Sequence, residues 1–181
     1  MTLAELAWPL ARAGDALAAL AARTGLIVGA GEVAAVGEAV LADRDEAALD
    51  RWLGGAAATL GLEAEAIDSD LGGVDELLRG CAPALLRVAG GRRLLLVVRG
   101  GRRALTVLTP ELRTRPVALA AVRDELCASV LAPMRGDAEA LVLRIGVSAA
   151  RRGRVVDLLL RERLAARRVG RAWLLRPSPA A

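Results

Sequence analysis

The residue types that most often carry acid–base and nucleophilic chemistry are scarce in this sequence. The 181 residues include no histidine, so the commonest general base and the usual activator of a serine or cysteine nucleophile are missing. Cys81 follows a predicted helix, whose dipole disfavours a thiolate, and Cys127 lies beside Leu126 on an amphipathic segment. We therefore predict that both cysteines are buried apolar residues. Their spacing fits neither a disulfide framework nor a zinc site.

Carboxylate pairs and glycine–arginine turns are the other groups that could do chemistry. Asp68 and Asp70 form one such pair, but turns and helix starts commonly carry acids, so we interpret them as capping and solvated groups. The sequence Gly-Gly-Arg-Arg occurs at Gly90–Arg93 and again at Gly100–Arg103. Each copy is predicted to join two strands rather than to open a helix, so the mechanism of a phosphate-binding loop is missing. We interpret both as hairpin turns with solvated arginines.

An apolar stretch from Pro83 to Pro110 is the element around which any site must be built. Glycine pairs separate its Val- and Leu-rich runs, a pattern typical of antiparallel strands joined by tight turns in which glycine supplies a positive φ. The runs are Ala84–Ala89, Leu94–Val98 and Ala104–Leu108. We predict a three-stranded meander at about residues 83–109. The rest of the chain is predicted to be mostly helical, so the expected fold class is α+β, with helices packed on a small antiparallel sheet.

Helical periodicity and capping signals indicate where those helices lie. The predicted helices are Gly14–Arg23, Asp45–Leu60, Leu71–Arg79, Val117–Val130 and Ala149–Arg168. Asp15 is expected to cap the first, Asp43 with Glu46 to cap the second, and Pro133 to stop the fourth. The stretch 26–41 remains ambiguous because of its glycines. Extended segments are predicted at Leu62–Ile67 and Leu141–Val147.

Positive charge is concentrated towards the C-terminal end. Residues 1–150 carry 16 arginines and 19 acids, whereas residues 151–181 carry 9 arginines and 2 acids. Such clustering suits a phosphate-bearing partner, either nucleic acid or an anionic membrane face. No apolar run approaches the roughly 20 residues that a membrane span needs, and no signal sequence opens the chain, so a reducing cytosolic compartment is expected.

Four short motifs follow one another through the middle of the chain. They are the Gly-Leu-containing phrase Leu60–Ile67, the proline-led run Pro83–Val88, the hairpin Gly100-Gly101 and the turn Thr109-Pro110. With the order of the helices, they resemble the bacteriocin-processing cysteine peptidase domain found at the N-terminus of certain bacterial ABC exporters. The resemblance covers roughly residues 10–130 and implies a papain-like fold.

The same resemblance implies that the catalytic residues are missing. The family's nucleophilic cysteine would open the first long helix, near Arg12 to Gly14, where no cysteine stands. Its histidine would begin the second meander strand, where this chain has Arg92 and Arg93, and its aspartate would precede the proline of the turn, where it has Thr109. We therefore expect a degenerate domain that is not an enzyme and has no catalytic residue, metal or cofactor of its own. A parent transporter would use ATP and Mg²⁺.

Inactive domains of this kind bind the exported polypeptide near the transport channel, so the expected function is docking of an exported peptide or protein. The other expected partners are the transmembrane and nucleotide-binding domains of the exporter, a second copy through a dimeric transporter, and an anionic membrane surface. The expected location is the cytoplasmic face of the bacterial inner membrane, or the cytosol for a free-standing chain. Candidate substrate-binding residues are Trp8, Arg92, Arg93, Arg102 and Arg103, and the alternative for Trp8 is a plain core or surface tryptophan.

The expected domain organisation has three parts. Residues 1–132 form the peptidase-like domain, residues 133–148 a linker, and residues 149–181 a basic helix with an arginine-rich lead-in to a membrane region. The alternative function is a cytosolic adaptor or nucleic-acid-binding module that uses this basic tail. The absence of Phe and Tyr counts against base stacking in that alternative.

Overall fold

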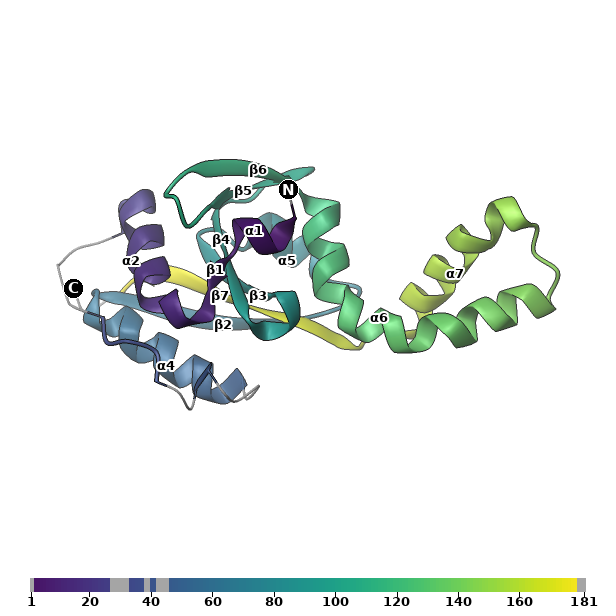
Figure 1. Cartoon of the computed structure of the whole chain (residues 1–181), viewed down its shortest axis with the longest axis horizontal. Helices are drawn as coiled ribbons and strands as arrows, with labels where there is room; N and C mark the ends of the chain where they lie inside the picture. The colour runs from purple at the N-terminus through teal and green to yellow at the C-terminus, as the bar shows by residue number, and fades with distance from the viewer. Residues whose placement is uncertain (1, 27–32, 38–39, 42–45, 179–181) are drawn as a thin grey trace.

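The computed structural model describes residues 2–26, 33–37, 40–41 and 46–178. The fold is built on a seven-stranded sheet (Figure 1). Six of the strands follow the order β2-β7-β3-β4-β5-β6, and the short strand β1 pairs with β4. Every strand pair is antiparallel. The strands are β1 Trp8–Pro9, β2 Leu62–Asp70, β3 Ala84–Val88, β4 Arg93–Arg99, β5 Ala104–Leu108, β6 Thr114–Ala118 and β7 Arg168–Pro177. The helices are α1 Leu3–Leu6, α2 Ala13–Thr24, α4 Glu46–Thr59, α5 Val74–Gly80, α6 Leu119–Arg144 and α7 Ala149–Arg163, with short 3-10 turns η1 Leu10–Arg12 and η2 Ala89–Gly91. The α+β prediction is confirmed.

The predicted meander is confirmed as β3, β4 and β5. The two turns require glycine for different physical reasons. Gly90 and Gly91 have φ values of +64° and +87°, which favour glycine. Gly100, in the second turn, has no positive φ, but a Cβ atom there would lie 2.3 Å from the carbonyl oxygen of Arg79. The second turn therefore needs glycine because it packs directly on the backbone of α5.

The sheet separates two apolar cores, which explains why its central strands are continuous apolar runs. On β4, Leu94 and Leu96 face the core that α2 and α4 cover, while Leu95 and Val97 face the core on the side of α5 and α6. All four side chains are fully buried. Because successive residues of a strand point to opposite faces, each core takes every second residue.

The N-terminal helices agree with the predictions, apart from their caps. α2 ends at Gly25, whose left-handed φ of +71° closes the helix. Asp15 does not cap α2. It accepts a 2.9 Å hydrogen bond from Arg12 Nε, and Arg12 occupies the N-cap position without a side-chain cap. The predicted cap of α4 by Asp43 lies outside the described residues.

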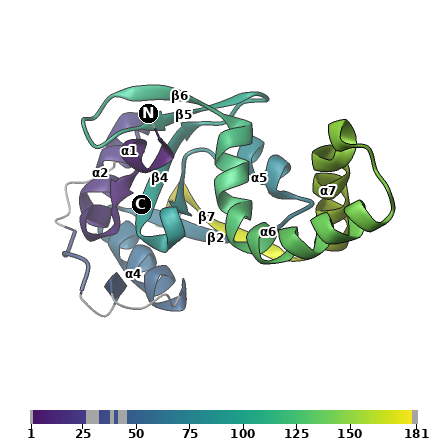
Figure 2. The same cartoon turned by 45° about the vertical axis from the view of Figure 1, so that its right-hand side comes forward.

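The predictions for residues 114–147 are partly wrong. β6 occupies the expected start of a helix, and α6 runs from Leu119 through Pro133 to Arg144. Residues 133–144 are therefore helix rather than linker, and no strand forms over 141–147. Pro133 is exposed, so water can reach the Ser129 carbonyl that loses its helical partner. The second half of α6 and α7 form an arm, residues 133–163, that projects from the body (Figures 1 and 2).

The C-terminal segment is an integral part of the sheet. β7 pairs along its length with β2 and also with β3, so it lies between two strands that come earlier in the chain. Part of the basic segment 149–181 is therefore a strand of the sheet, and the sheet crosses the predicted boundary at residue 132. Ala172 and Trp173 are fully buried, which ties β7 into both cores.

Candidate functional site

Trp8 lies at the centre of the region that the resemblance marks as the site. It pairs with Leu94 in the β1–β4 ladder, and its side chain is 1% exposed. The indole Nε1 donates a 2.9 Å hydrogen bond to the carbonyl oxygen of Leu108 at the end of β5. Trp8 is thus a core residue, as the alternative interpretation had it, and its prediction as a substrate contact is wrong because no ligand can reach the ring.

Three separate parts of the chain meet around this indole. The guanidinium of Arg12 lies over the Trp8 ring, 4.9 Å from its centroid. Arg93, at the start of β4, donates a 3.0 Å hydrogen bond from Nη1 to the carbonyl oxygen of Ala7. Thr109 directly follows the carbonyl that accepts the Trp8 hydrogen bond, and its side chain is buried. Arg12 therefore contacts the Trp8 ring itself, whereas Arg93 contacts the backbone of the preceding residue and Thr109 follows the residue that accepts the Trp8 hydrogen bond.

Two of these positions carry arginines, whose protonated guanidinium groups serve neither as nucleophiles nor as general bases. Arg12 is paired with Asp15 at 2.9 Å, and an arginine stays protonated at any physiological pH. The Thr109 Oγ1 atom is buried without a hydrogen-bond partner in the described residues. The chain has no histidine that could activate the Thr109 hydroxyl.

Both cysteines are buried, as predicted, and they are not paired with each other. Burial raises the pKa of the Cys81 thiol to about 11 and also raises the pKa of the Cys127 thiol. Since the thiolate is the reactive form, neither side chain is a candidate nucleophile near neutral pH.

The predicted substrate-binding arginines do not form one site. Arg92 and Arg93 lie at the start of β4, whereas Arg102 and Arg103 lie in the turn that follows the other end of this strand. Arg102 and Arg103 are exposed and line a wide, open hollow of about 810 Å³ with Arg79. Arg93 is already committed to the Ala7 carbonyl. Only the first pair adjoins Trp8.

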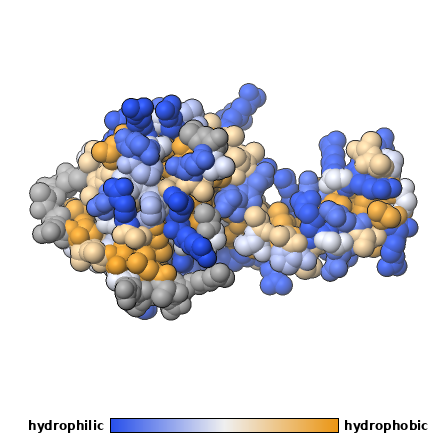
Figure 3. Space-filling view, viewed as in Figure 1, coloured by the Kyte–Doolittle hydropathy of each residue, from blue (hydrophilic) through white to orange (hydrophobic). Residues whose placement is uncertain are grey.

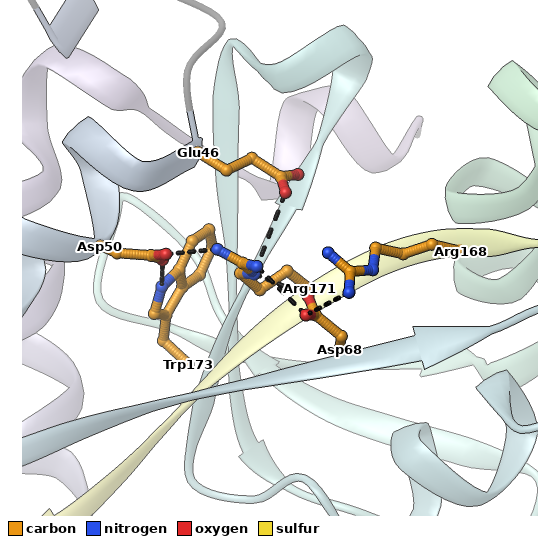
Figure 4. A network of polar contacts seen from close by, with 6 residues as sticks. All are labelled: Glu46, Asp50, Asp68, Arg168, Arg171 and Trp173. Carbon is orange, nitrogen blue, oxygen red and sulfur yellow. Dashed lines mark hydrogen bonds and ion pairs between the residues drawn. The ribbon is translucent and has the colours of Figure 1, made fainter.

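A polar network centred on Arg171 was not predicted (Figure 4). The Arg171 guanidinium, whose side chain is 15% exposed, contacts Asp50 of α4 and Asp68 of β2, with Nε to Asp68 Oδ1 at 2.7 Å. Asp50 also accepts a 2.6 Å hydrogen bond from Trp173 Nε1. Glu46 lies 3.9 Å from Arg171 Nε at the edge of the network.

The network joins three elements through one half-buried guanidinium. The hydrogen bond from Arg171, together with the positive charges of Arg171 and Arg168, lowers the pKa of Asp68. The same hydrogen bond, together with the negative charges of Asp50, Asp68 and Glu46, raises the pKa of Arg171. Asp68 faces Arg171 directly across the β2–β7 ladder. The spacing of Glu46 and Asp50 places them on one helix face, and this could have been noticed from the sequence. Their partners Arg171 and Trp173 lie on β7, however, and this strand was not predicted.

The basic tail proves to be divided into a paired and an unpaired part. Arg168 and Arg171 pair with Asp68, and Arg176 Nη1 lies 3.1 Å from Glu65 Oε2. The positive charge of β7 is therefore largely balanced by the acidic edge strand β2. The arginines at the start of α7 have no such acids beside them in sequence.

An open hollow of about 570 Å³ lies beside the β3–β4 turn and was not predicted from the sequence. Its apolar lining includes Val88, Leu126 and Val169, and charged groups such as Arg87 and Arg171 stand among them. η2, β3, β7 and α6 contribute most of its wall. The turn that borders the hollow leads within two residues to Arg93, so the hollow and the Trp8 region flank the same turn.

Comparison with known proteins identifies no relative: no family model, no curated protein and no solved structure matches this chain. Among the described residues, no group of three or more histidine, cysteine, aspartate or glutamate side chains could hold a metal ion. None of the described helices is long and apolar enough to cross a bilayer.

Proposed function

We propose that this chain is a non-catalytic, papain-like relative of the peptidase domains of bacterial ABC exporters, and that it docks an exported peptide. The observation that carries the proposal is the convergence of Arg12, Arg93 and Thr109 around Trp8. In the family that the sequence resembles, these positions would hold the nucleophile, the base and its orienting acid. Here they hold two arginines and a threonine, which can support a fold but cannot cleave a peptide.

The arrangement of elements around Trp8 agrees with this assignment. α2 begins directly after Arg12 and packs on β4 through the core that contains Leu17 and Leu94. Thus one helix starts where a nucleophile would be expected, and the neighbouring strand starts where a base would be expected. Thr109 stands before Pro110 in the turn that follows β5, at the position expected for the acid.

The hollow beside the β3–β4 turn is the docking site in this proposal. Its volume of about 570 Å³ is within the usual range of ligand pockets, and its apolar lining suits the aliphatic side chains of an extended peptide. The charged groups around it would fix the peptide backbone and any polar side chains. Ser129 of α6 is exposed and lines the hollow, so it offers a place to obstruct it from outside the core.

The test is binding of a fluorescent synthetic leader peptide that ends in Gly-Gly, measured by anisotropy on the whole chain. Ser129→Trp should fill the hollow and weaken binding at least tenfold. Ala120→Trp is the matched control, because Ala120 is an exposed residue of the same helix outside the hollow, and it should bind as the parent does. Equal binding by both variants, or no binding by the parent, would contradict the docking proposal.

Mass spectrometry of the same mixtures tests the loss of catalysis. The peptide should remain intact with and without a reducing agent, since both thiols are buried and no histidine is present. Cleavage that iodoacetamide abolishes would overturn the non-catalytic assignment.

The proposed setting is the cytoplasmic face of a bacterial inner membrane, in a dimeric exporter whose other domains cross the membrane and hydrolyse ATP with Mg²⁺. This part rests on the resemblance and is tested on the gene. The reading frame beyond Ala181 should continue into apolar segments and a phosphate-binding loop. A free-standing gene with no such neighbour would contradict it.

A further inference from the structure

The far end of the arm carries exposed aliphatic side chains. Leu143 is 59% exposed and Ile145 is 65% exposed, at the point where α6 turns into α7. Six large hydrophobic residues are exposed in the described part of the chain, and four of them lie on the arm: Met134, Leu143, Ile145 and Leu158. Because apolar surface of this kind is concentrated where proteins meet partners, the arm end is a candidate contact surface.

The same end is strongly and uniformly basic. Residues 140–156, which we call the arm tip, contain four arginines and no acidic residue. The arginines are Arg144, Arg151, Arg152 and Arg154, and all are exposed. Arg152 Nε donates to the Val147 carbonyl at 2.9 Å, but within the described residues none of the four forms an ion pair. Figure 3 shows hydrophilic and hydrophobic residues interleaved along the arm.

Arg144 suits the last turn of α6, but helix stability does not explain the other arginines of the tip. These three fall in the first two turns of α7, where positive charge opposes the helix dipole. Ser148, at the N-cap, makes no side-chain cap hydrogen bond that would compensate. An external anionic partner would offset this repulsion.

We propose that the arm tip docks on an anionic lipid surface, with its arginines on the headgroup phosphates and Leu143 and Ile145 at the acyl boundary. This combination of basic residues around a few inserted aliphatic side chains is the chemistry of interfacial membrane anchors. The exposed aliphatic residues favour lipid over nucleic acid, which would leave them in water. The proposal stands on the arm alone and does not depend on peptide docking in the hollow.

The test is co-sedimentation of the whole chain with vesicles of phosphatidylcholine alone or with about one-third phosphatidylserine. Binding should need the anionic lipid and should fall as salt is raised, because the attraction is screened. Arg151→Gln with Arg154→Gln should weaken binding about fivefold for each arginine removed. Leu143→Asn with Ile145→Asn should weaken it roughly tenfold, from the lost apolar burial.

The body offers a smaller comparison patch that also combines an exposed aliphatic side chain with exposed arginines, but has the acidic Glu111 beside it. Leu112 is 62% exposed, and Arg113 and Arg115 beside it are exposed as well. Leu112→Asn, which suits the positive φ of 61° at that position, and Arg113→Gln with Arg115→Gln should leave vesicle binding unchanged. The proposal is overturned if tip and control variants bind alike. It is also overturned if the chain ignores vesicles but binds a DNA duplex through the tip arginines.

Discussion

Replacing Arg171 by leucine should lower the free energy of unfolding more than replacing any other arginine that forms a described ion pair. The substitution keeps the apolar stem of the side chain but leaves the Asp50 and Asp68 carboxylates without their shared cation. Those carboxylates have side chains that are 28% and 32% exposed, so water compensates them only in part. The Trp173 hydrogen bond to Asp50 would remain.

The expected loss of stability depends on how deeply the Arg171 network is buried. A hydrogen bond to a charged group contributes about 1.5–3 kcal/mol, and leaving a fully buried charge unpaired costs about 3–5 kcal/mol. Because both acids keep some contact with solvent, we expect a loss of about 2–3 kcal/mol in the free energy of unfolding, below the fully buried case. Arg176→Leu removes an exposed pair with Glu65 from the same strand and should cost less than about 1 kcal/mol.

Urea denaturation of the parent and the two variants measures these differences. The Arg171 contribution should also depend on pH. The folded-state pKa of Asp68 is lowered by Arg171, so this acid stabilises the fold at pH values above its unfolded-state pKa of about 4, and that stabilisation is lost as the pH falls through the lower folded-state value. The difference in the free energy of unfolding between the parent and Arg171→Leu should therefore become smaller at acidic pH. If Arg171→Leu costs no more than Arg176→Leu, the network contributes no special stability and the reasoning fails.

Three further predictions concern the cores and the backbone. Leu53→Ala should lower the free energy of unfolding by about 2–5 kcal/mol in urea, because Leu53 is fully buried; a change near zero would contradict its core role. Gly100→Ala should lower it by about 1–3 kcal/mol through the clash with a backbone oxygen of α5, whereas Gly55→Ala, in open space on α4, should raise it by about 0.5–1 kcal/mol; the opposite order in thermal melts would refute the packing argument. Cys81 and Cys127 should react with Ellman's reagent near pH 8 only after unfolding, since burial raises both thiol pKa values; rapid labelling of the native chain would contradict this.

Local sequence signals were sufficient to predict strands that are buried on both faces and end in glycine turns. β3, β4 and β5 are apolar on both faces and bounded by glycine, so short-range pattern alone located them. The sequence did not predict β7 because Arg171, one of its half-buried positions, has the residue type of a solvent-exposed site until its acidic partners on β2 and α4 are known. α6 was cut short because Pro133 normally ends a helix, and because its buried face shifts from the sheet to α7 partway along.

For the candidate site, too, the sequence revealed which residue types are present but not which distant residues come into contact. The proposal that the chain does not cleave peptides could be made from the sequence alone, because the absence of histidine needs no structure to be seen. It could not show that Trp8 is buried, because that depends on a two-residue strand pairing with β4 across more than 80 positions. Nor could it separate Arg92 from Arg102, since both stand in similar glycine turns at opposite ends of one strand.

The central position of β7 has a consequence for how the chain acquires its fold. Asp68 and Arg171, which face each other in the sheet, are 103 positions apart, so this pairing closes a very long loop. During synthesis β2 and β3 emerge early, and each exposes a strand edge until residues 168–177 leave the ribosome. We expect the sheet to close only after synthesis of β7, as a slow, non-local step. Nascent chains that stall before Arg168 should therefore be the species most prone to aggregate.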